Sequence, residues 1–327
     1  MDNIVNTVLA KPQYLKSVDY VIGLVKRLDS EGKRLSKSIS NGEILVRLAE
    51  MREKAQQGLD MSDLPRNVES LVEAGKRILS NVEKHEKHMP DAKYFAEFAK
   101  PYQNKTQSGI TRQATELEKI ISKALSIPRS SVSKHILESQ RGMSEAYAAI
   151  LPTLESYHQS IVSDAKDLGD VQSRIKDPKS CWGKQFRQGE KPFIYFKDLI
   201  GTRITGVDAR EAAVIATEVQ QKFDVMEKKN YFLDNSRYNA INYTLSKDWM
   251  VFELQVKTAS SQFEGSIDHS LIYAPEKSIT RLSEREREMV ATVVAVSTLL
   301  SMREWNEAFR VPIKITKKVA DRFQGLF

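Results

Sequence analysis

The stretch from Val171 to Arg203 reads VQSRIKDPKSCWGKQFRQGEKPFIYFKDLIGTR and decides how the chain around it is expected to fold. Two runs, Phe193–Phe196 inside it and Leu199–Ile204 at its end, have the composition of β-strands. Asp198 lies between these runs, and four cations share the stretch: Arg174, Lys176, Lys184 and Arg203. A carboxylate among cations suits a site for polyphosphate and a divalent metal, because phosphates attract positive charge and the metal needs oxygen ligands. The alternative is that these side chains are solvated at the surface, as most charged side chains are.

The composition limits the class of protein. The chain has 327 residues, a net charge of +7 and one cysteine, Cys181. This length is enough for about two domains, and one cysteine excludes an intrachain disulfide and a Cys-rich zinc site. The longest apolar run, Met289–Met302, is too short to cross a bilayer, and the first residues lack a signal-peptide pattern. We therefore expect a cytoplasmic protein with no membrane partner, and the positive charge indicates acidic partners such as nucleotides or RNA.

The first part of the chain reads as helices only, so residues 1–128 are predicted to form a helical domain of unknown role. Helical spacing is found around Leu45, after Ser62 and over Ile110–Leu125. The histidines of HEKH, His85 and His88, could share a metal on one helix face, but a solvated helix end is the stronger interpretation. The segment SIPRSSVS (residues 126–133) combines proline with serines and supplies the predicted boundary.

The second predicted domain, residues 129–327, has an α+β pattern. His135–Lys166 has helical spacing that Pro152 would kink or break, and Ala209–Phe223 reads as an amphipathic helix. Strands are predicted over Ile241–Leu245 and Met250–Val256, followed by helices over Ser261–Tyr273 and Ser283–Met302. This order predicts a mixed β-sheet with flanking helices.

Glu253 is the second carboxylate of interest. It lies two residues before Gln255 on a predicted strand, so both side chains point to the same face, opposite to Phe252 and Leu254. If this strand lies beside the segment of Asp198, the two carboxylates can hold Mg²⁺ and leave coordination positions for phosphate oxygens.

Five blocks in one order carry a family resemblance. They read SRIKDPKSCWGK, KDLIGTRI, SRYNAINYTL, FELQVKT and EGSIDHSLIY. Together they resemble the synthetase domain of the RelA/SpoT-type alarmone synthetases, over roughly half of the chain, and the small alarmone synthetases in particular. The resemblance implies a nucleotidyltransferase-like fold and an ATP-dependent pyrophosphokinase that makes (p)ppGpp, by transfer of pyrophosphate to the 3′-hydroxyl of GDP or GTP.

The resemblance also implies roles for individual residues. Arg174 and Arg203 would sandwich the adenine of ATP, since planar guanidinium groups stack on aromatic rings. Lys176, Ser180 and Lys184 would contact the ATP phosphates. Asp198 and Glu253 would bind Mg²⁺, with Glu253 also drawing the proton from the attacking hydroxyl. Four residues would line the acceptor side: Tyr238, by stacking on the acceptor base, and Gln255, Lys257 and His269.

The acceptor block departs from the family pattern. The family usually has G-Y-x-S-L-H, whereas this chain has Arg237-Tyr238-Asn239-Ala240-Ile241-Asn242. This keeps two alternatives open: a toxin-like enzyme that pyrophosphorylates an adenine nucleotide or the 3′ end of tRNA, and a non-catalytic nucleotide sensor. Simpler roles also stay open for three residues: a packed Tyr238, a strand-surface Lys257 and a His269 that only caps a helix. A homo-oligomer and a neutralising antitoxin or immunity partner are further expectations from the resemblance.

Overall fold

The computed structural model describes residues 12–36, 39–56, 102, 104–231, 239–273 and 280–309. Two N-terminal helices, α2 (Pro12–Ser30) and α3 (Asn41–Gln56), are followed by α6 (Thr106–Leu125), α7 (Arg129–Glu138) and α8 (Gln140–Ala165). The helices α9 (Pro178–Arg187) and α10 (Ala209–Lys222) lie between strands, and α12 (Ala259–Asp268), the π-helical η4 (His269–Tyr273) and α13 (Glu284–Phe309) follow the last strand. The predicted helical N-terminal region and α+β class are confirmed.

A five-stranded mixed sheet forms the centre of the molecule. Its strands are β1 (Asp170–Ile175), β2 (Ile200–Gly206), β3 (Asp224–Asn230), β4 (Ile241–Lys247) and β5 (Met250–Thr258). They lie in the order β1-β2-β5-β4-β3. β2 and β5 are parallel, and the other neighbours are antiparallel. The two strands that carry the predicted carboxylate segments are therefore adjacent.

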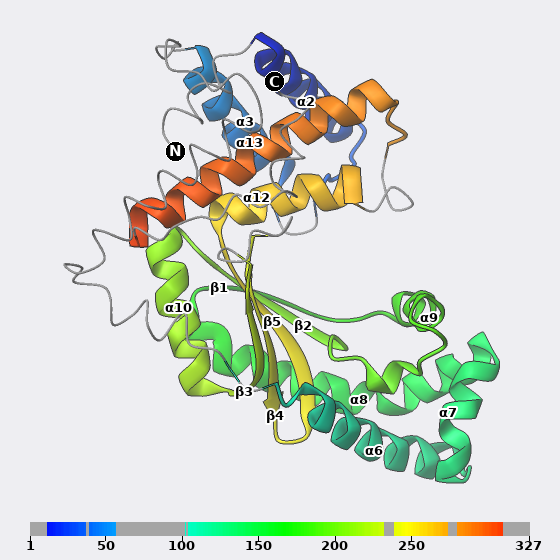
Figure 1. Ribbon diagram of the computed structural model, residues 1–327. Helices are drawn as coiled ribbons and strands as arrows, with labels where there is room; N and C mark the ends of the chain where they lie inside the picture. The colour runs from blue at the N-terminus through cyan, green and yellow to red at the C-terminus, as the bar shows by residue number, and fades with distance from the viewer. Residues whose placement is uncertain are drawn as a thin grey trace.

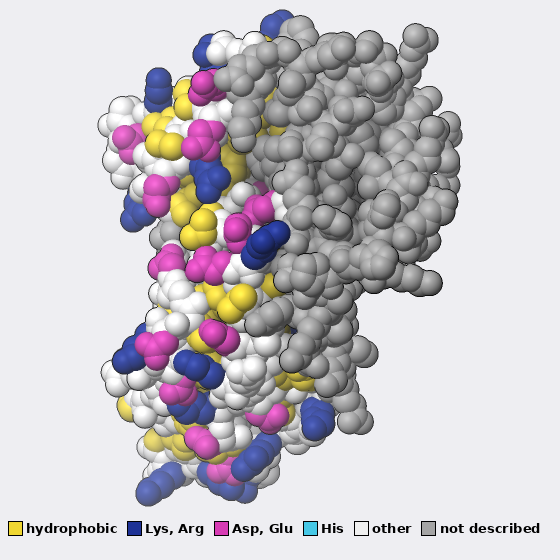
Figure 2. Space-filling model, turned by 90° about the vertical axis from the view of Figure 1, so that its left-hand side faces the viewer, with side chains coloured by type: hydrophobic (Ala, Val, Ile, Leu, Met, Phe, Trp, Pro, Cys, Tyr) yellow, Lys and Arg dark blue, Asp and Glu magenta, His cyan; other side chains and the backbone are white. Residues whose placement is uncertain are grey.

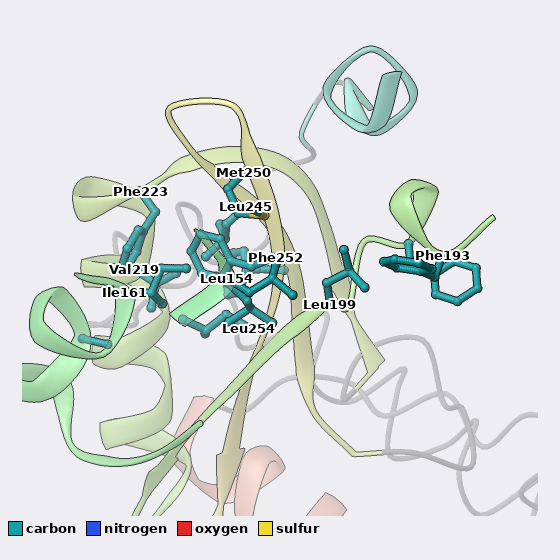
Figure 3. Close-up of a cluster of buried hydrophobic side chains, with 14 of the residues drawn as sticks. Leu154, Ile161, Phe193, Leu199, Val219, Phe223, Leu245, Met250, Phe252 and Leu254 are labelled. Carbon is teal, nitrogen blue, oxygen red and sulfur yellow. The ribbon is translucent and has the colours of Figure 1, made fainter. Parts of the chain in front are cut away.

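One face of the sheet is covered by α8 and α10. Apolar residues at alternate positions of β5, such as Phe252 and Leu254, meet Leu154 of α8 and Val219 of α10 in one core, and Figure 3 shows these side chains packed together. Full burial of such a side chain contributes roughly 1.5–3 kcal/mol. The sheet is therefore anchored on this face, and its other face remains for polar residues.

A second hydrophobic core joins α2 and α3 to α12, η4 and α13. The hydroxyl of Tyr20 in α2 donates a hydrogen bond to Glu286 of α13 at 2.8 Å. The Oγ atoms of Ser36 and Ser266 lie 3.1 Å apart, which ties the segment between α2 and α3 to α12. Figure 1 shows these helices together at one end of the sheet, whereas α6 and α7 lie at the other end.

The two cores do not divide at residue 128. Helix α6, on the N-terminal side of the predicted boundary, contributes Ala114, Leu117 and Ile121 to the core of the sheet. α7 also begins inside the serine-rich segment that was expected to link the domains. The assignment of residues 1–128 and 129–327 to two domains stays a prediction, but this boundary does not separate the cores.

Three local expectations were wrong. Phe193–Phe196 was predicted as a strand but contains the 3₁₀ helix η3 (Phe193–Tyr195). The helix expected over His135–Lys166 is broken at Ser139, whose extended backbone and side chain cap α8 by accepting a hydrogen bond from the amide of Gly142. Pro152 was expected to kink or break that helix; the break is wrong, because α8 continues through Pro152, and the kink stays a prediction.

Five other predictions on helices and strands are confirmed: the helices around Leu45, over Ile110–Leu125 and over Ala209–Phe223, and the strands β4 and β5. The helix expected after Ser62, together with His85 and His88, lies outside the described residues. On the face drawn in Figure 2, cationic and anionic side chains of the described residues lie interspersed. None of the helices, within the described ranges, has both the length and the apolar character that a membrane span requires.

Candidate functional site

A row of residues crosses the polar face of the sheet. The strand register pairs Arg174 of β1 with Gly201 of β2, Gly201 with Glu253 of β5, Glu253 with Thr244 of β4, and Thr244 with Glu227 of β3. Residues that are paired across adjacent strands point to the same face. Glu253 therefore lies at the centre of the sheet, and a Cβ added at Gly201 would meet nothing within 4 Å. Open space thus adjoins the Glu253 carboxylate.

A second row runs parallel to the first. It contains Gln172, Arg203, Gln255 and Asn242, on β1, β2, β5 and β4. The Nη2 atom of Arg203 donates to Oε1 of Gln255 at 3.3 Å, and Nε2 of Gln255 donates to Oε2 of Glu253 at the same distance. Oδ1 of Asn242 is buried and has no hydrogen-bond partner, so the row offers an acceptor to a ligand. The predicted pairing of Gln255 with Glu253 on one face is confirmed.

Asp198 lies in the turn directly before β2 and is held by two lysines. Nζ of Lys176 is 2.8 Å from one carboxylate oxygen and Nζ of Lys184 is 2.6 Å from the other. Burial raises the pKa of Asp198, but the hydrogen bonds and charges of the two lysines lower it more, and the net pKa lies below the ordinary value. The carboxylate is therefore ionised at neutral pH. These three predicted site residues are brought together.

Buried hydrogen bonds fix the segment that carries Asp198. Gln113 of α6 is fully buried, and its amide donates to the carbonyl oxygens of Ile194 and Phe196, each at 3.0 Å. Its oxygen accepts from the amide of Val251 in β5 at 2.8 Å. One side chain thus ties η3 to the strand of Glu253, because each of these buried backbone groups needs a partner.

The arginines predicted to hold a purine lie on the same face as Glu253. Arg174 is paired with Gly201, so Arg203 is its diagonal neighbour on the adjacent strand. Diagonal neighbours lie about 7–8 Å apart, which leaves room for one planar ring between two guanidinium groups. Arg174 is exposed and Arg203 is partly buried, so a ring could enter from solvent.

Ser180 lies in the first turn of α9. Its amide and its hydroxyl both donate to the carboxylate of Asp177, which caps the helix, at 2.8 and 2.7 Å. The N-terminus of a helix attracts anions, and Lys184 lies one turn further along the same helix. The Ser180 hydroxyl would have to leave Asp177 to contact a phosphate, so its predicted role stays untested.

Lys257 is buried, with a relative exposure of 2%. A strand-surface lysine is therefore wrong as an interpretation. Burial lowers the pKa of Lys257 most, the charge of Arg203 lowers it as well, and Glu264 and Asp268 of α12 raise it, so that the net pKa is about 7. His269 is exposed at the start of η4, and Tyr238 lies outside the described residues.

Lys197 and Glu227 were not selected from the sequence. Nζ of Lys197 lies 3.3 Å from both Oε2 of Glu227 and Oγ1 of Thr244, on the face of Glu253. A second lysine, Lys229, pairs with Glu227 at 2.9 Å. The signal was the position of Lys197 directly before Asp198, but β3 reads DVMEKKN, which lacks the alternation of a half-buried strand.

The donor set can be compared with what a magnesium ion requires. Mg²⁺ is commonly held by one or two carboxylates, with phosphate oxygens and water in the remaining positions. Asp198 comes three residues before Gly201, which pairs with Glu253, so two carboxylates come from neighbouring parts of the sheet. No cluster of three or more His, Cys, Asp or Glu exists among the described residues. The residues thus fit an ion that is shared with a bound phosphate.

Comparison with known proteins gives one family match. Residues 173–278 match the model described as "Region found in RelA / SpoT proteins". Comparison with curated proteins found no match.

Similar solved structures include two from Bacillus subtilis and one from Streptococcus pneumoniae. The small alarmone synthetase 1 of B. subtilis is 17% identical with a TM-score of 0.40, over 49% of this chain and 95% of that chain. Its complex with the product pppGpp is 15% identical with a TM-score of 0.40, over 52% and 100%. A GTP pyrophosphokinase family protein of S. pneumoniae is 14% identical with a TM-score of 0.39, over 57% and 97%.

Proposed function

We propose that the chain is an ATP-dependent pyrophosphokinase, from the premise that residues 173–278 match the model of the region found in RelA/SpoT proteins. It transfers the pyrophosphate of ATP to the 3′-hydroxyl of GDP or GTP. The observation that carries the proposal is the ion pair of Asp198 with Lys176 and Lys184, in the turn directly before β2, the strand that pairs with the strand of Glu253. Cations for phosphates and two carboxylates thus come from neighbouring parts of the sheet.

Each part of the site has a role in this reaction. Arg174 and Arg203 bind the adenine between them. Lys176 and Lys184, which Asp198 holds in place, bind the phosphates of ATP. Asp198 and Glu253 would hold Mg²⁺, which would supply charge neutralisation when bound. Phosphoryl-type transfer depends mainly on positioning and electrostatics, so fixed lysines that are pre-oriented by a carboxylate suit it.

Glu253 has the position of a general base. It lies beside the open space at Gly201, and a hydroxyl bound there can give its proton to the carboxylate as the bond to the β-phosphorus of ATP forms. AMP then leaves with the electrons of the broken bond. Gln255 bonds to Glu253 and to Arg203, so it orients this carboxylate relative to the purine site.

The acceptor side rests on Tyr238, Gln255, Lys257 and His269. Oδ1 of Asn242 adds an acceptor that lacks a partner on this face, at a position where the family pattern has histidine. This departure gives the toxin-like alternative its support, with an adenine nucleotide or a tRNA 3′ end as acceptor.

The test uses the full chain with ATP labelled in its β- and γ-phosphates and four acceptors: GDP, GTP, AMP and deacylated tRNA. Label on GDP or GTP with equal release of AMP supports the proposal. Label on tRNA or AMP alone would replace it with the toxin-like alternative. ATP binding without AMP release would leave a nucleotide sensor. The Glu253→Gln variant serves as the control in each arm, because it keeps the shape of the side chain and removes the base.

A further inference from the structure

Glu264 in α12 is a buried carboxylate that lies away from the reacting groups. Its relative exposure is 2%. Oε2 accepts a hydrogen bond from Nδ2 of Asn239 at 2.7 Å, and Oε1 accepts one from Oγ1 of Thr298 in α13 at 2.7 Å. A buried carboxylate is costly unless it is paired, so this arrangement must be stabilised by its partners.

Asn239 connects Glu264 to the start of β4. It is only 3% exposed and directly follows Tyr238 in the chain. One residue further, the carbonyl oxygen of Ala240 accepts a hydrogen bond from the amide of Tyr231 at 2.9 Å. Asn242 follows in β4, with its orphaned amide oxygen in the row of Arg203 and Gln255. A displacement of Asn239 would therefore move this strand start on the acceptor side.

Lys257 connects Glu264 to the end of β5. A Cβ added at Gly265 would lie 2.7 Å from Nζ of Lys257, so the ammonium group lies against the helix residue that follows Glu264. Glu264 and Asp268 favour the charged form of Lys257, against burial and the charge of Arg203. Glu264 thus bonds to the segment before β4 and acts electrostatically on the end of β5.

We propose that Glu264 is a positioning residue that sets the acceptor side of the site, by anchoring Asn239 and facing Lys257. The inference rests on the proposed function. Glu264 is then a specificity determinant that contacts neither nucleotide. It acts through the first residues of β4 and the last residues of β5. α13 supports it through Thr298, so the second hydrophobic core is coupled to acceptor binding.

The test changes Asn239 alone and then changes Asn239 and Glu264 together. Asn239→Asp places two carboxylates against each other, and we expect the KM for GDP to rise at least about tenfold, because the hydrogen bond that anchors residue 239 to Glu264 is lost. The KM for ATP should change by less than about twofold, because the arginine side of the sheet keeps its contacts. The double variant Asn239→Asp with Glu264→Gln restores a donor facing an acceptor, so the KM for GDP should return to within about threefold of the original.

The chain contains a matched control. Nδ2 of Asn41 in α3 donates to Oδ1 of Asp29 at 3.1 Å, and Asn41 is 4% exposed. Asn41→Asp also places a new carboxylate against an existing one, the exposed Asp29, away from the sheet, so it should lower the Tm and leave the KM for GDP unchanged. The inference is overturned if Asn239→Asp behaves like Asn41→Asp, if it raises both KM values equally, or if the double variant does not recover.

A second measurement separates this inference from the proposed function. Hydrogen exchange of the Tyr231 amide reports its bond to Ala240 without any catalysis. Exchange should be faster in Asn239→Asp, normal in the double variant and normal in Asn41→Asp. If no acceptor is labelled by the unmodified protein, the proposed function has failed, and exchange alone decides whether Glu264 anchors this strand start. Unchanged exchange in Asn239→Asp would overturn the anchor.

Discussion

The Nζ atom of Lys184 lies 2.6 Å from Oδ1 of Asp198 and 4.7 Å from the centre of the Phe196 ring. The lysine is thus held between a carboxylate and an aromatic face, both of which come from the segment before β2. Charge-assisted hydrogen bonds of this kind are shorter and stronger than neutral ones. Lys184 is therefore oriented before any phosphate arrives, which lowers the entropy that binding must cost.

Replacement of Asp198 by Asn tests the metal-binding role. The variant keeps the volume of the side chain but loses its negative charge, so we expect kcat to fall by about 10²–10³-fold, the range for loss of one electrostatic contact to a transition state. AMP release is the measured quantity. Asp170→Asn, on the same sheet but exposed at the start of β1, should retain activity; an equal loss in both variants would contradict the assignment.

Lys257 should make stability depend on pH above neutrality. Its folded-state pKa is lowered to about 7, whereas an unfolded lysine has a pKa of about 10.4. Between these values the unfolded chain binds more protons, so stability should rise with pH, by at most about 1.4 kcal/mol per unit. The penalty for burying the charge is complete below pH 7. Urea unfolding from pH 6 to 10 measures how the free energy of unfolding changes with pH. This slope should be smaller in Lys257→Met, and equal slopes in the two proteins would refute the role of Lys257.

Gln113→Leu should destabilise the protein and the site together. The change leaves the carbonyls of Ile194 and Phe196 and the amide of Val251 without their partner. We expect a loss of about 3 kcal/mol in the free energy of unfolding, and a lower kcat because the segment of Asp198 loses its anchor. Urea denaturation and AMP release are the measurements. Gln107→Leu, on the exposed side of the same helix, is the matched control and should change neither.

Two glycines of β2 should respond in opposite ways to alanine. At Gly201 an added Cβ meets nothing within 4 Å, so stability should stay the same or rise by up to about 1 kcal/mol. The KM for substrates should nevertheless increase, because the methyl group takes space beside Glu253. At Gly206 a Cβ would lie 2.8 Å from the backbone nitrogen of Ala212, so this variant should lose about 1–3 kcal/mol. Thermal unfolding and steady-state kinetics distinguish the two, and a large loss of stability at Gly201 would contradict the open space.

The helices and the inner strands could be predicted because their burial is periodic. α10 buries Ala212, Ile215, Ala216 and Val219 at helical spacing, and β5 alternates around Glu253. β1 and β3 escaped prediction because they lie at the two edges of the sheet, where strands bury less and need no apolar run. The strand predicted at Phe193 was wrong because aromatic composition does not distinguish a strand from a short buried 3₁₀ turn.

The site was predicted in part, for a physical reason. Asp198, Lys176 and Lys184 could be grouped because they are close in the sequence, and Arg203, Gln255 and Glu253 because strand alternation places them on one face. Lys197, Glu227 and Glu264 could not be selected, since their partners are set by the sheet order and by the packing of α12. Tertiary contacts over long sequence separations leave no local pattern.

The contact of Tyr20 with Glu286 spans 266 positions of the chain, and this has a consequence for synthesis on the ribosome. Helices α2 and α3 emerge early, but the helices that complete their apolar core, α12 and α13, are made much later. Until then the apolar side chains of the early helices stay exposed to solvent, a state in which chains aggregate or recruit chaperones. Because Thr298 of α13 also donates a hydrogen bond to Glu264, the buried carboxylate of a nascent chain would lack this partner until α13 has left the exit tunnel.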